Sequence, residues 1–195
     1  FNRHAQPALR VAARLLPITV AILVRKNSTI RNLADLKGKR FPTGYTEQKT
    51  FALVADALLA NAALSTSDVK GVPVPNGKSA LQLFMQGKLD AVVWVLGDES
   101  LKSIDSKLTA TTAVGAPKAI TPSARSRKTT GKKSTTKTTK SLGGIRVLAM
   151  TNTPEAVARM GSNYPLAYLF ELQPSKDTVG VSAPTWVMAF DLVLV

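Results

Sequence analysis

The sequence contains no cysteine and a single histidine, His4, among 195 residues. Without cysteine the chain has no disulfide, no thiolate nucleophile and no cysteine-ligated metal site. One histidine provides no histidine pair for a metal, and a Ser-His-Asp triad would depend on a residue beside the start of the chain. The composition therefore argues against most hydrolases and metalloenzymes, and we expect neither catalysis nor a bound metal.

Acidic residues are scarce: 12 Asp and Glu stand against 26 Lys and Arg, which gives a net charge of +14. The excess is concentrated in Thr109–Ser141, which carries eight Lys or Arg, ten Thr and four Ser, with no acidic residue. Large apolar residues are missing from Ser123–Ser141, so this stretch cannot bury enough surface to offset the entropy lost on ordering. We expect a basic, disordered insert.

Two interpretations of this insert remain open. In the first, an arm that resembles histone tails binds nucleic acid or another polyanion through salt-dependent, sequence-independent contacts with phosphates. The cations of this arm would be Arg125, Arg127, Lys128, Lys132 and Lys133. In the second, the insert is a solvated linker within a fold made by its flanks. No aromatic residue lies between Trp94 and Tyr164, so the insert has no platform for stacking bases.

Long apolar runs are also missing. The longest, Val11–Val24, is interrupted by Arg14 and Pro17 and is shorter than the about 20 residues needed to span a bilayer. Basic residues follow it in place of a signal-peptide cleavage site, so we interpret it as a buried strand region. A hydrophobic content of 45% nevertheless excludes a chain that is disordered throughout.

Strand and helix patterns alternate along the chain. The strand patterns are Ile18–Val24, Lys39–Thr43, Val69–Pro75, Leu89–Leu96, Ile145–Met150 and Trp186–Val195. The clearest helix has an apolar face from Phe51 to Ala62 and Thr46 placed as its cap. Three further helices are expected to begin at Ser28, at Ser79 and after Thr153. This alternation predicts an α/β sandwich with a largely parallel sheet.

In open α/β sheets, ligands bind at the loops that follow the carboxyl ends of strands. One such loop, Thr43–Gln48, connects a strand to the strongest helix, where free amides and the helix dipole suit a carboxylate or phosphate. Thr43, Thr46, Tyr45 and Gln48 could orient the anion, whereas the Glu47 carboxylate would oppose it. The alternative is that Thr46 only caps the helix and Gly44 only turns the chain. The acidic pair Asp98-Glu99 is interpreted as a solvated turn.

Several segments, in their order along the chain, resemble TAXI-type solute receptors of TRAP transporters. Thr19–Arg40 is similar to the entry of the family's second lobe, and Ser79–Gly97 to its element of helix, Gly-Lys-hydrophobic-Asp-Ala and strand. Gly143–Leu148 and Pro184–Asp191 are similar to the return into the first lobe. The resemblance implies an α/β, periplasmic-binding-protein-like fold with one complete lobe, part of the second and the basic insert, truncated at both ends.

The resemblance also divides the chain into four parts. Residues 1–17 would be a hinge or crossover segment, 18–98 the ligand-binding lobe, 99–141 a linker with the Lys/Thr-rich insert, and 142–195 the incomplete return of the other lobe. With much of one lobe missing, exposed apolar surface would favour self-association.

The implied function is binding of a small organic anion, such as a carboxylate or glutamate, in the periplasm. The protein would deliver it to the membrane permease subunits of a TRAP transporter, without catalysis or a cofactor. By position in the family pattern, the ligand contacts would come from the following residues: Thr43, Gly44, Tyr45, Thr46, Gln48, Asn76, Gly77, Leu96 and Gly97.

Overall fold

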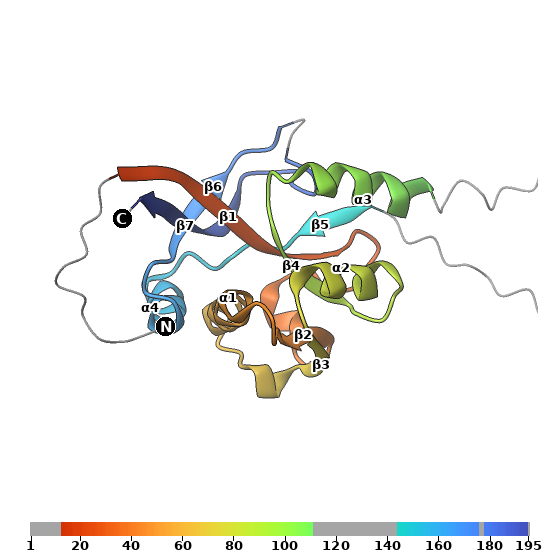
Figure 1. The fold of residues 1–195 in the computed structure, drawn as a ribbon, viewed down its shortest axis with the longest axis horizontal. Coiled ribbons are helices and arrows are strands. Elements are labelled where there is room, and N and C mark those ends of the chain that lie inside the picture. The colour runs from red at the N-terminus through yellow and green to blue at the C-terminus, as the bar shows by residue number, and fades with distance from the viewer. Residues whose placement is uncertain (1–12, 111–143, 176–177, 195) are drawn as a thin grey trace, which may run out of the picture.

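The structure is a computed structural model that describes residues 13–110, 144–175 and 178–194 (Figure 1). Its strands are β1 (Ala13–Arg25), β2 (Arg40–Gly44), β3 (Lys70–Val74), β4 (Ala91–Val95), β5 (Ile145–Val147), β6 (Tyr168–Leu172) and β7 (Thr185–Leu194). Its helices are α1 (Lys49–Asn61), α2 (Gly77–Met85), α3 (Glu99–Ala110) and α4 (Pro154–Asn163), with short 3-10 turns η1 (Leu33–Leu36) and η2 (Thr66–Asp68). The predicted α/β class is confirmed.

The long strand β1 is the centre of the larger sheet, whose order is β4-β1-β7-β6. One edge of β1 pairs with β4, and the other pairs first with β7 and then, at the carboxyl end, with β5. All of these pairings are antiparallel, as is that of β6 with β7. The predicted largely parallel sheet is therefore wrong for this part of the fold. The consecutive apolar residues Val20–Val24 are all buried. Such a run indicates that both faces of the strand are covered, but it does not indicate whether the neighbouring strands are parallel or antiparallel.

The smaller sheet consists of β2 and β3, which pair in parallel from Arg40↔Lys70 to Gly44↔Val74. The start of β2 is joined to the start of β4 by a bidentate contact, in which Arg40 donates to both Asp90 carboxylate oxygens at 3.1 and 2.6 Å. The backbone N–H of Asp90 also donates to the Arg40 carbonyl at 3.0 Å. The bonds that the Arg40 side chain and its backbone N–H donate to the Asp90 carboxylate hold the pKa of Asp90 below its usual range.

The helix starts agree with the predictions only in part. Thr153 caps α4 as predicted, accepting the N–H of Ala156 at 3.3 Å. The predicted caps Ser28, Thr46 and Ser79 are wrong, because Asn32 caps η1, Gln48 precedes α1 without a side-chain cap, and Asn76 caps α2. The side chains of Asn32 and Asn76 reach the third amide of their helices, which is the geometry of a good cap.

The helix α3 occupies Glu99–Ala110, where the sequence predicts the beginning of a linker. Its buried residues Leu101, Ile104 and Leu108 recur at helical spacing and belong to the core. The remaining positions are mostly polar, so only this narrow apolar stripe marks the helix in the sequence. The predicted division of the chain into four parts stays a prediction.

The segment after the insert packs closely on the part before it. Helices α1 and α4 lie side by side (Figure 1). Asn61 is fully buried, and its side chain exchanges two hydrogen bonds with the backbone of Thr151, at 3.0 and 2.8 Å. Arg159 of α4 donates to the carbonyls of Ala60 and Asn61 at the carboxyl end of α1.

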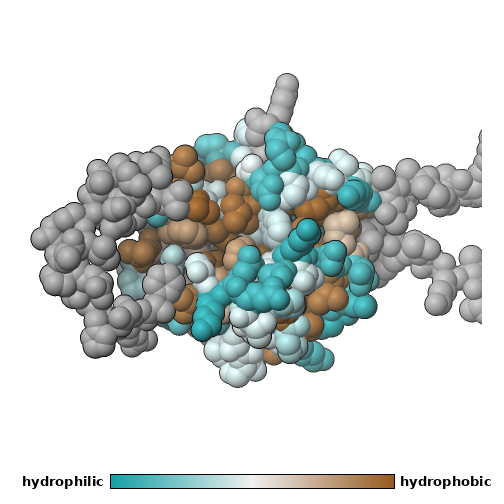
Figure 2. Space-filling model, viewed as in Figure 1, coloured by the Kyte–Doolittle hydropathy of each residue, from teal (hydrophilic) through white to brown (hydrophobic). Residues whose placement is uncertain are grey.

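Apolar side chains gather on part of the face shown in Figure 2, over the large sheet. Large hydrophobic residues that remain exposed are Leu16 on β1, Phe170 on β6 and Leu166 just before β6. Self-association through this surface stays a prediction. Within the described residues, no helix has the length and apolar character needed to span a bilayer.

Candidate functional site

The two loops predicted to bind the solute are neighbours in the structure. Because β2 and β3 are parallel, their carboxyl ends meet at one edge, with Gly44 opposite Val74. The loops are bonded to each other: Asn76 Nδ2 donates to a Glu47 carboxylate oxygen at 2.6 Å, and the Glu47 N–H donates to the Pro75 carbonyl at 2.9 Å. Gln48 Oε1 accepts the N–H of Gly77 at 2.8 Å. The structure thus brings Thr43–Gln48 and Asn76-Gly77 into one polar network.

Most of the backbone N–H groups that were expected to bind an anion already donate hydrogen bonds within this network. The amides of Glu47 and Gly77 are bonded as above, the Gln48 N–H donates to the Tyr45 carbonyl at 3.0 Å, and the Ser79 N–H donates to Asn76 Oδ1 at 2.9 Å. A donor already paired within the protein must break that bond before it can bind a ligand. The amides of Glu47, Gln48 and Gly77 are therefore not free to bind an anion.

Tyr45 is a predicted contact whose side chain the structure buries, at the inner wall of a cavity next to β2. Its side chain is fully buried, its ring lies 5.8 Å from that of Phe51, and burial raises the pKa of its phenol. The backbone of Tyr45 is left-handed, with φ 36°, and follows Gly44 at φ 87°. Two successive positive φ angles reverse the chain sharply and direct the aromatic ring inward. The ring belongs to the core.

The remaining predicted contacts differ in their exposure. Thr46 and Gln48 are exposed, and Thr43 is half-buried against Gly71, where an added Cβ would lie 2.8 Å from the threonine hydroxyl. Leu96 is buried, and its N–H donates to the Thr19 carbonyl at 2.8 Å. Gly97 is exposed in a left-handed turn, with φ 83°. Because β2 and β4 lie side by side from a common start, Gly97 follows β4 at the same edge as the two loops.

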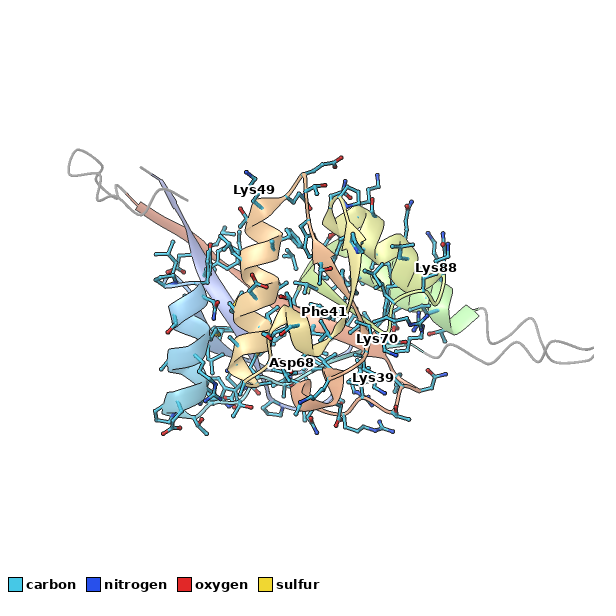
Figure 3. The ribbon with its side chains drawn as sticks, turned by 90° about the horizontal axis from the view of Figure 1, so that it is seen from below. Lys39, Phe41, Lys49, Asp68, Lys70 and Lys88 are labelled. Carbon is cyan, nitrogen blue, oxygen red and sulfur yellow. The ribbon has the colours of Figure 1, made fainter. Side chains whose placement is uncertain are left out.

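What this edge still offers to an anion is the N-terminus of α1. Its N-cap residue, Gln48, forms no side-chain cap, and its first turn contains no acidic residue. The residues Lys49 and Thr50 are both exposed, and Lys49 points away from the body of the molecule at the start of the helix (Figure 3). The helix dipole and the lysine ammonium both favour negative charge at this position. Sequence reasoning missed Lys49 because it placed the cap at Thr46, two residues before the observed N-cap Gln48.

A cavity of about 350 Å³ lies beside this edge, between β2 and α1, and Thr43, Gly44 and Asp56 are among the residues that line it. Asp56 is half-buried, and burial raises the pKa of its carboxyl group. A carboxylate on this wall disfavours an anion inside the cavity. An anion at this edge would therefore be held at the start of α1 and outside the cavity.

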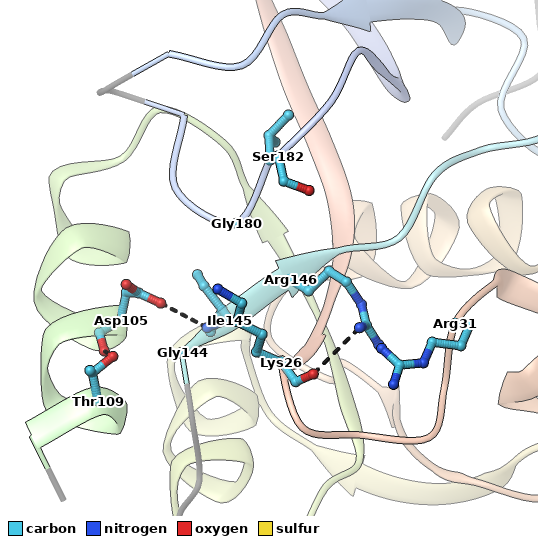
Figure 4. A pocket seen from close by; sticks show the side chains of 10 residues that line it. Lys26, Arg31, Asp105, Thr109, Gly144, Ile145, Arg146, Gly180 and Ser182 are labelled. Carbon is cyan, nitrogen blue, oxygen red and sulfur yellow. Dashed lines mark hydrogen bonds between the residues drawn. The ribbon is translucent and has the colours of Figure 1, made fainter. Parts of the chain in front are cut away.

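A larger cavity, of about 680 Å³, lies at the carboxyl end of β1 (Figure 4). Three cations, Lys26, Arg31 and Arg146, are among the residues that line it. Arg146 is more than a hundred residues from the other two, so only the pairing of β5 with β1 brings them together, and no local motif announces the cluster.

Three further features of the sequence concern metal ligands, the Asp98 turn and the basic insert. Among the described residues, no group of three or more His, Asp or Glu side chains could hold a metal ion. Asp98 is exposed and accepts the Ser100 N–H at 2.9 Å, as a polar turn would. The predicted polyanion-binding residues lie outside the described residues: Arg125, Arg127, Lys128, Lys132 and Lys133.

Comparison with known families decides the kinship of the chain. The model of the NMT1/THI5-like family matches residues 2–142. The chain belongs to the NMT1/THI5-like family. Membership of the TAXI family is not confirmed, although the motifs that resemble it fall largely within the matched residues. No curated protein matches this NMT1/THI5-like chain.

Solved structures that this NMT1/THI5-like chain resembles include three sulfonate-binding proteins. The sulfonate-binding protein SsuA of Methylobacillus flagellatus KT is 25% identical, with a TM-score of 0.38, over 45% of this chain and 27% of that one. The alkanesulfonate-binding SsuA of Xanthomonas axonopodis pv. citri is 26% identical, with a TM-score of 0.36, over 46% and 29%. The aliphatic sulphonate binding protein SsuA of Escherichia coli is 16% identical, with a TM-score of 0.36, over 91% and 38%. The chain thus spans less than two fifths of the length of these three proteins.

Proposed function

We propose that this chain forms one complete lobe and part of the second lobe of a solute-binding protein and binds a small organic anion, without catalysis. Family kinship and the TAXI-like motifs support the solute-binding role. The single observation that carries the location is the exposed, uncapped start of α1 at the sheet edge where the loops after β2, β3 and β4 converge.

The proposed contacts are a revision of those expected from the sequence. The Thr46 hydroxyl, the Lys49 ammonium and the first amides of α1 would hold a carboxylate. Asn76 and Gln48 act indirectly, because their side chains tie the two loops together and fix the start of the helix. The buried residues Tyr45 and Leu96 support the loops from within the core.

The partner that the motifs favour is the permease of a TRAP-type transporter in a periplasmic setting. The acidic amino acid glutamate and small dicarboxylates are the solutes to try first, since their carboxylates suit the helix start and Lys49. Asp56 faces the neighbouring cavity and would accept an ammonium group, which favours an amino acid over a plain dicarboxylate.

Calorimetry with glutamate, aspartate and succinate tests this proposal. We expect saturable binding by the full chain, weakened about tenfold or more in Lys49→Gln, since a charge-assisted hydrogen bond contributes about 1.5–3 kcal/mol. Lys70→Gln removes the same charge from the exposed start of β3, at the opposite end of that strand, and is expected to leave the affinity unchanged. Equal affinity in both variants, or no binding at millimolar solute, would exclude this site.

A further inference from the structure

The larger cavity is separate from the proposed solute site. It lies at the carboxyl end of β1, where Arg25 pairs with Ile145. Because β1 is antiparallel to β4, this end of β1 adjoins Ala91 at the start of β4, whereas Gly97 and the solute loops follow the carboxyl ends of their strands. The cavity thus opens at the opposite edge of the fold from Lys49. Its volume of about 680 Å³ is sufficient for a small metabolite.

The cations of this cavity have no acidic partner in the described residues. Lys26 and Arg31 are exposed, and neither forms an ion pair with a described carboxylate. The guanidinium groups of Arg31 and Arg146 lie next to each other in the cavity wall (Figure 4). Burial and, to a smaller extent, the charge of Arg31 hold the pKa of Arg146 below its usual value. Such a pair of like charges is relieved by an anion placed between them.

Arg146 is held rigidly in this position. It donates to the carbonyls of Lys26 at 3.4 Å and Ser28 at 3.5 Å, and also to that of Ile30. All three acceptors are neutral, and within the described part of the chain its buried Nε–H has no acceptor and its positive charge has no ionised partner. A guanidinium whose geometry is fixed before the ligand arrives loses little entropy on binding an oxyanion.

The opposite wall is fixed as well. One carboxylate oxygen of Asp105 accepts the Ile145 N–H at 2.7 Å, and Ser182 borders the same cavity across from α3 (Figure 4). Asp105 is itself a carboxylate and disfavours an anion beside it, so the oxyanion belongs at the wall with the cations, and the second oxygen of Asp105 is an acceptor for a hydroxyl or amine. The cavity thus presents cations on one wall and hydrogen-bonding groups on the other.

We propose that this cavity is a second binding site, for a small molecule whose oxyanion group is held by Lys26, Arg31 and Arg146. The group would lie against the two guanidiniums, and the rest of the molecule would extend towards Asp105 and Ser182. A phosphate group matches this site best, because it can accept from Arg31 and Lys26, whereas Arg146, whose donors already bond three carbonyls, attracts it through its charge. The proposal stands independently of the solute site at α1.

Titration of the full chain with inorganic phosphate, followed by NMR at constant ionic strength, tests the proposal. We expect saturable shifts of the backbone amides of Gly144, Ile145 and Gly180, which border the cavity. In Arg31→Gln the apparent dissociation constant should rise about tenfold or more. Arg31 is the residue to replace because no hydrogen bond of its side chain to the described fold would be lost with it.

Two controls make the result specific. Lys70→Gln removes one charge at a distant strand start and should leave the phosphate titration unchanged. Sodium chloride at matched ionic strength should produce no saturable shift of the same amides. The proposal fails if phosphate causes no saturable shift at these amides, if chloride shifts them equally, or if Arg31→Gln titrates like the unmodified protein.

Discussion

Asp105 in α3 and Ile145 in β5 are 40 residues apart and joined by a hydrogen bond of 2.7 Å from the Ile145 N–H to the Asp105 carboxylate. The Gly144 carbonyl next to it accepts the N–H of Lys26 at 2.7 Å. These bonds hold the middle of α3, the end of β1 and the beginning of β5 together, and Thr109 near the end of α3 lines the same cavity as Gly144. The basic insert therefore leaves and re-enters the described fold at neighbouring points.

The first prediction concerns this carboxylate. Replacing Asp105 with Ala leaves the N–H of the buried residue Ile145 without an acceptor, which costs about 1–3 kcal/mol in the free energy of unfolding. Urea unfolding followed by circular dichroism measures the change. Ser103→Ala, at an exposed position of the same helix, is the matched control and should change stability by less than about 0.5 kcal/mol. Equal stability of the two variants would mean that the Asp105 bond does not hold β5.

The second prediction concerns the glycine beside this bond. A Cβ built on Gly144 would overlap the Asp105 carboxylate oxygen, much closer than normal contact. Gly144→Ala should therefore displace Asp105 and lower the midpoint of thermal unfolding. The control is Gly161→Ala in α4, where a Cβ meets nothing within 4 Å and alanine favours the helix by about 1 kcal/mol. We expect opposite signs for the two alanine variants, and a Gly144→Ala protein as stable as Gly161→Ala would contradict the close approach.

The helix α3 illustrates what the sequence can and cannot predict. The apolar face of α1 and the cap of α4 are local patterns, and both predicted elements form where expected. In α3, only three buried residues among polar ones indicate a helix. Because the polar insert follows directly, the sequence pattern predicts a linker at these residues. Strand direction was not predictable either, because the buried run in β1 is equally compatible with parallel and antiparallel neighbours.

The candidate site shows the same limit at the level of single side chains. The parallel pairing of β2 and β3 brings the predicted loops together, but their mutual bonds depend on rotamers that no sequence pattern specifies. Tyr45 was predicted as a ligand contact because it is a polar aromatic in a loop. The left-handed backbone of Tyr45 and the ring of Phe51 turn it into the core, which only the folded chain reveals.

The third prediction uses two carboxyl groups whose pKa values shift in opposite directions. Hydrogen bonds from Arg40 lower the pKa of Asp90, so its stabilising contribution is present above its ordinary pKa and is lost as the pH falls through the range below about 4. Burial raises the pKa of Asp56. The contribution of Asp56 to the stability of the folded protein is therefore fully present below its ordinary pKa and is lost as the pH rises through its raised pKa.

Urea unfolding separates the two groups when it is measured from about pH 3, one unit below the ordinary pKa of an aspartate, to about pH 7. Asp90→Asn should destabilise the protein at neutral pH and flatten its loss of stability in acid. Asp56→Asn should instead stabilise the protein at neutral pH, with little effect in acid. If both variants change stability in the same direction at neutral pH, the assignment of opposite shifts is wrong.

The fourth prediction concerns the basic insert itself. Thr109 and Gly144 line one cavity, so a short Gly-Ser linker from Ala110 to Gly144 can span the gap in place of residues 111–143. This deletion removes eight positive charges without removing any residue of the described core. We expect cooperative unfolding and an unchanged circular dichroism spectrum after deletion. The unmodified chain should bind duplex DNA with an affinity that falls steeply with salt, because cations that neutralise phosphates release counterions.

Fluorescence anisotropy with labelled duplexes of two unrelated sequences tests whether the basic insert binds DNA or only links its flanks. An arm predicts similar affinities for both duplexes, a steep salt dependence, and a loss of binding on deletion. Replacing Arg125, Arg127, Lys128, Lys132 and Lys133 with Gln tests the same point without shortening the chain. A deletion variant that retains the full affinity for DNA would locate the binding on the folded part, whose own excess of positive charge includes Lys26, Arg31 and Arg146.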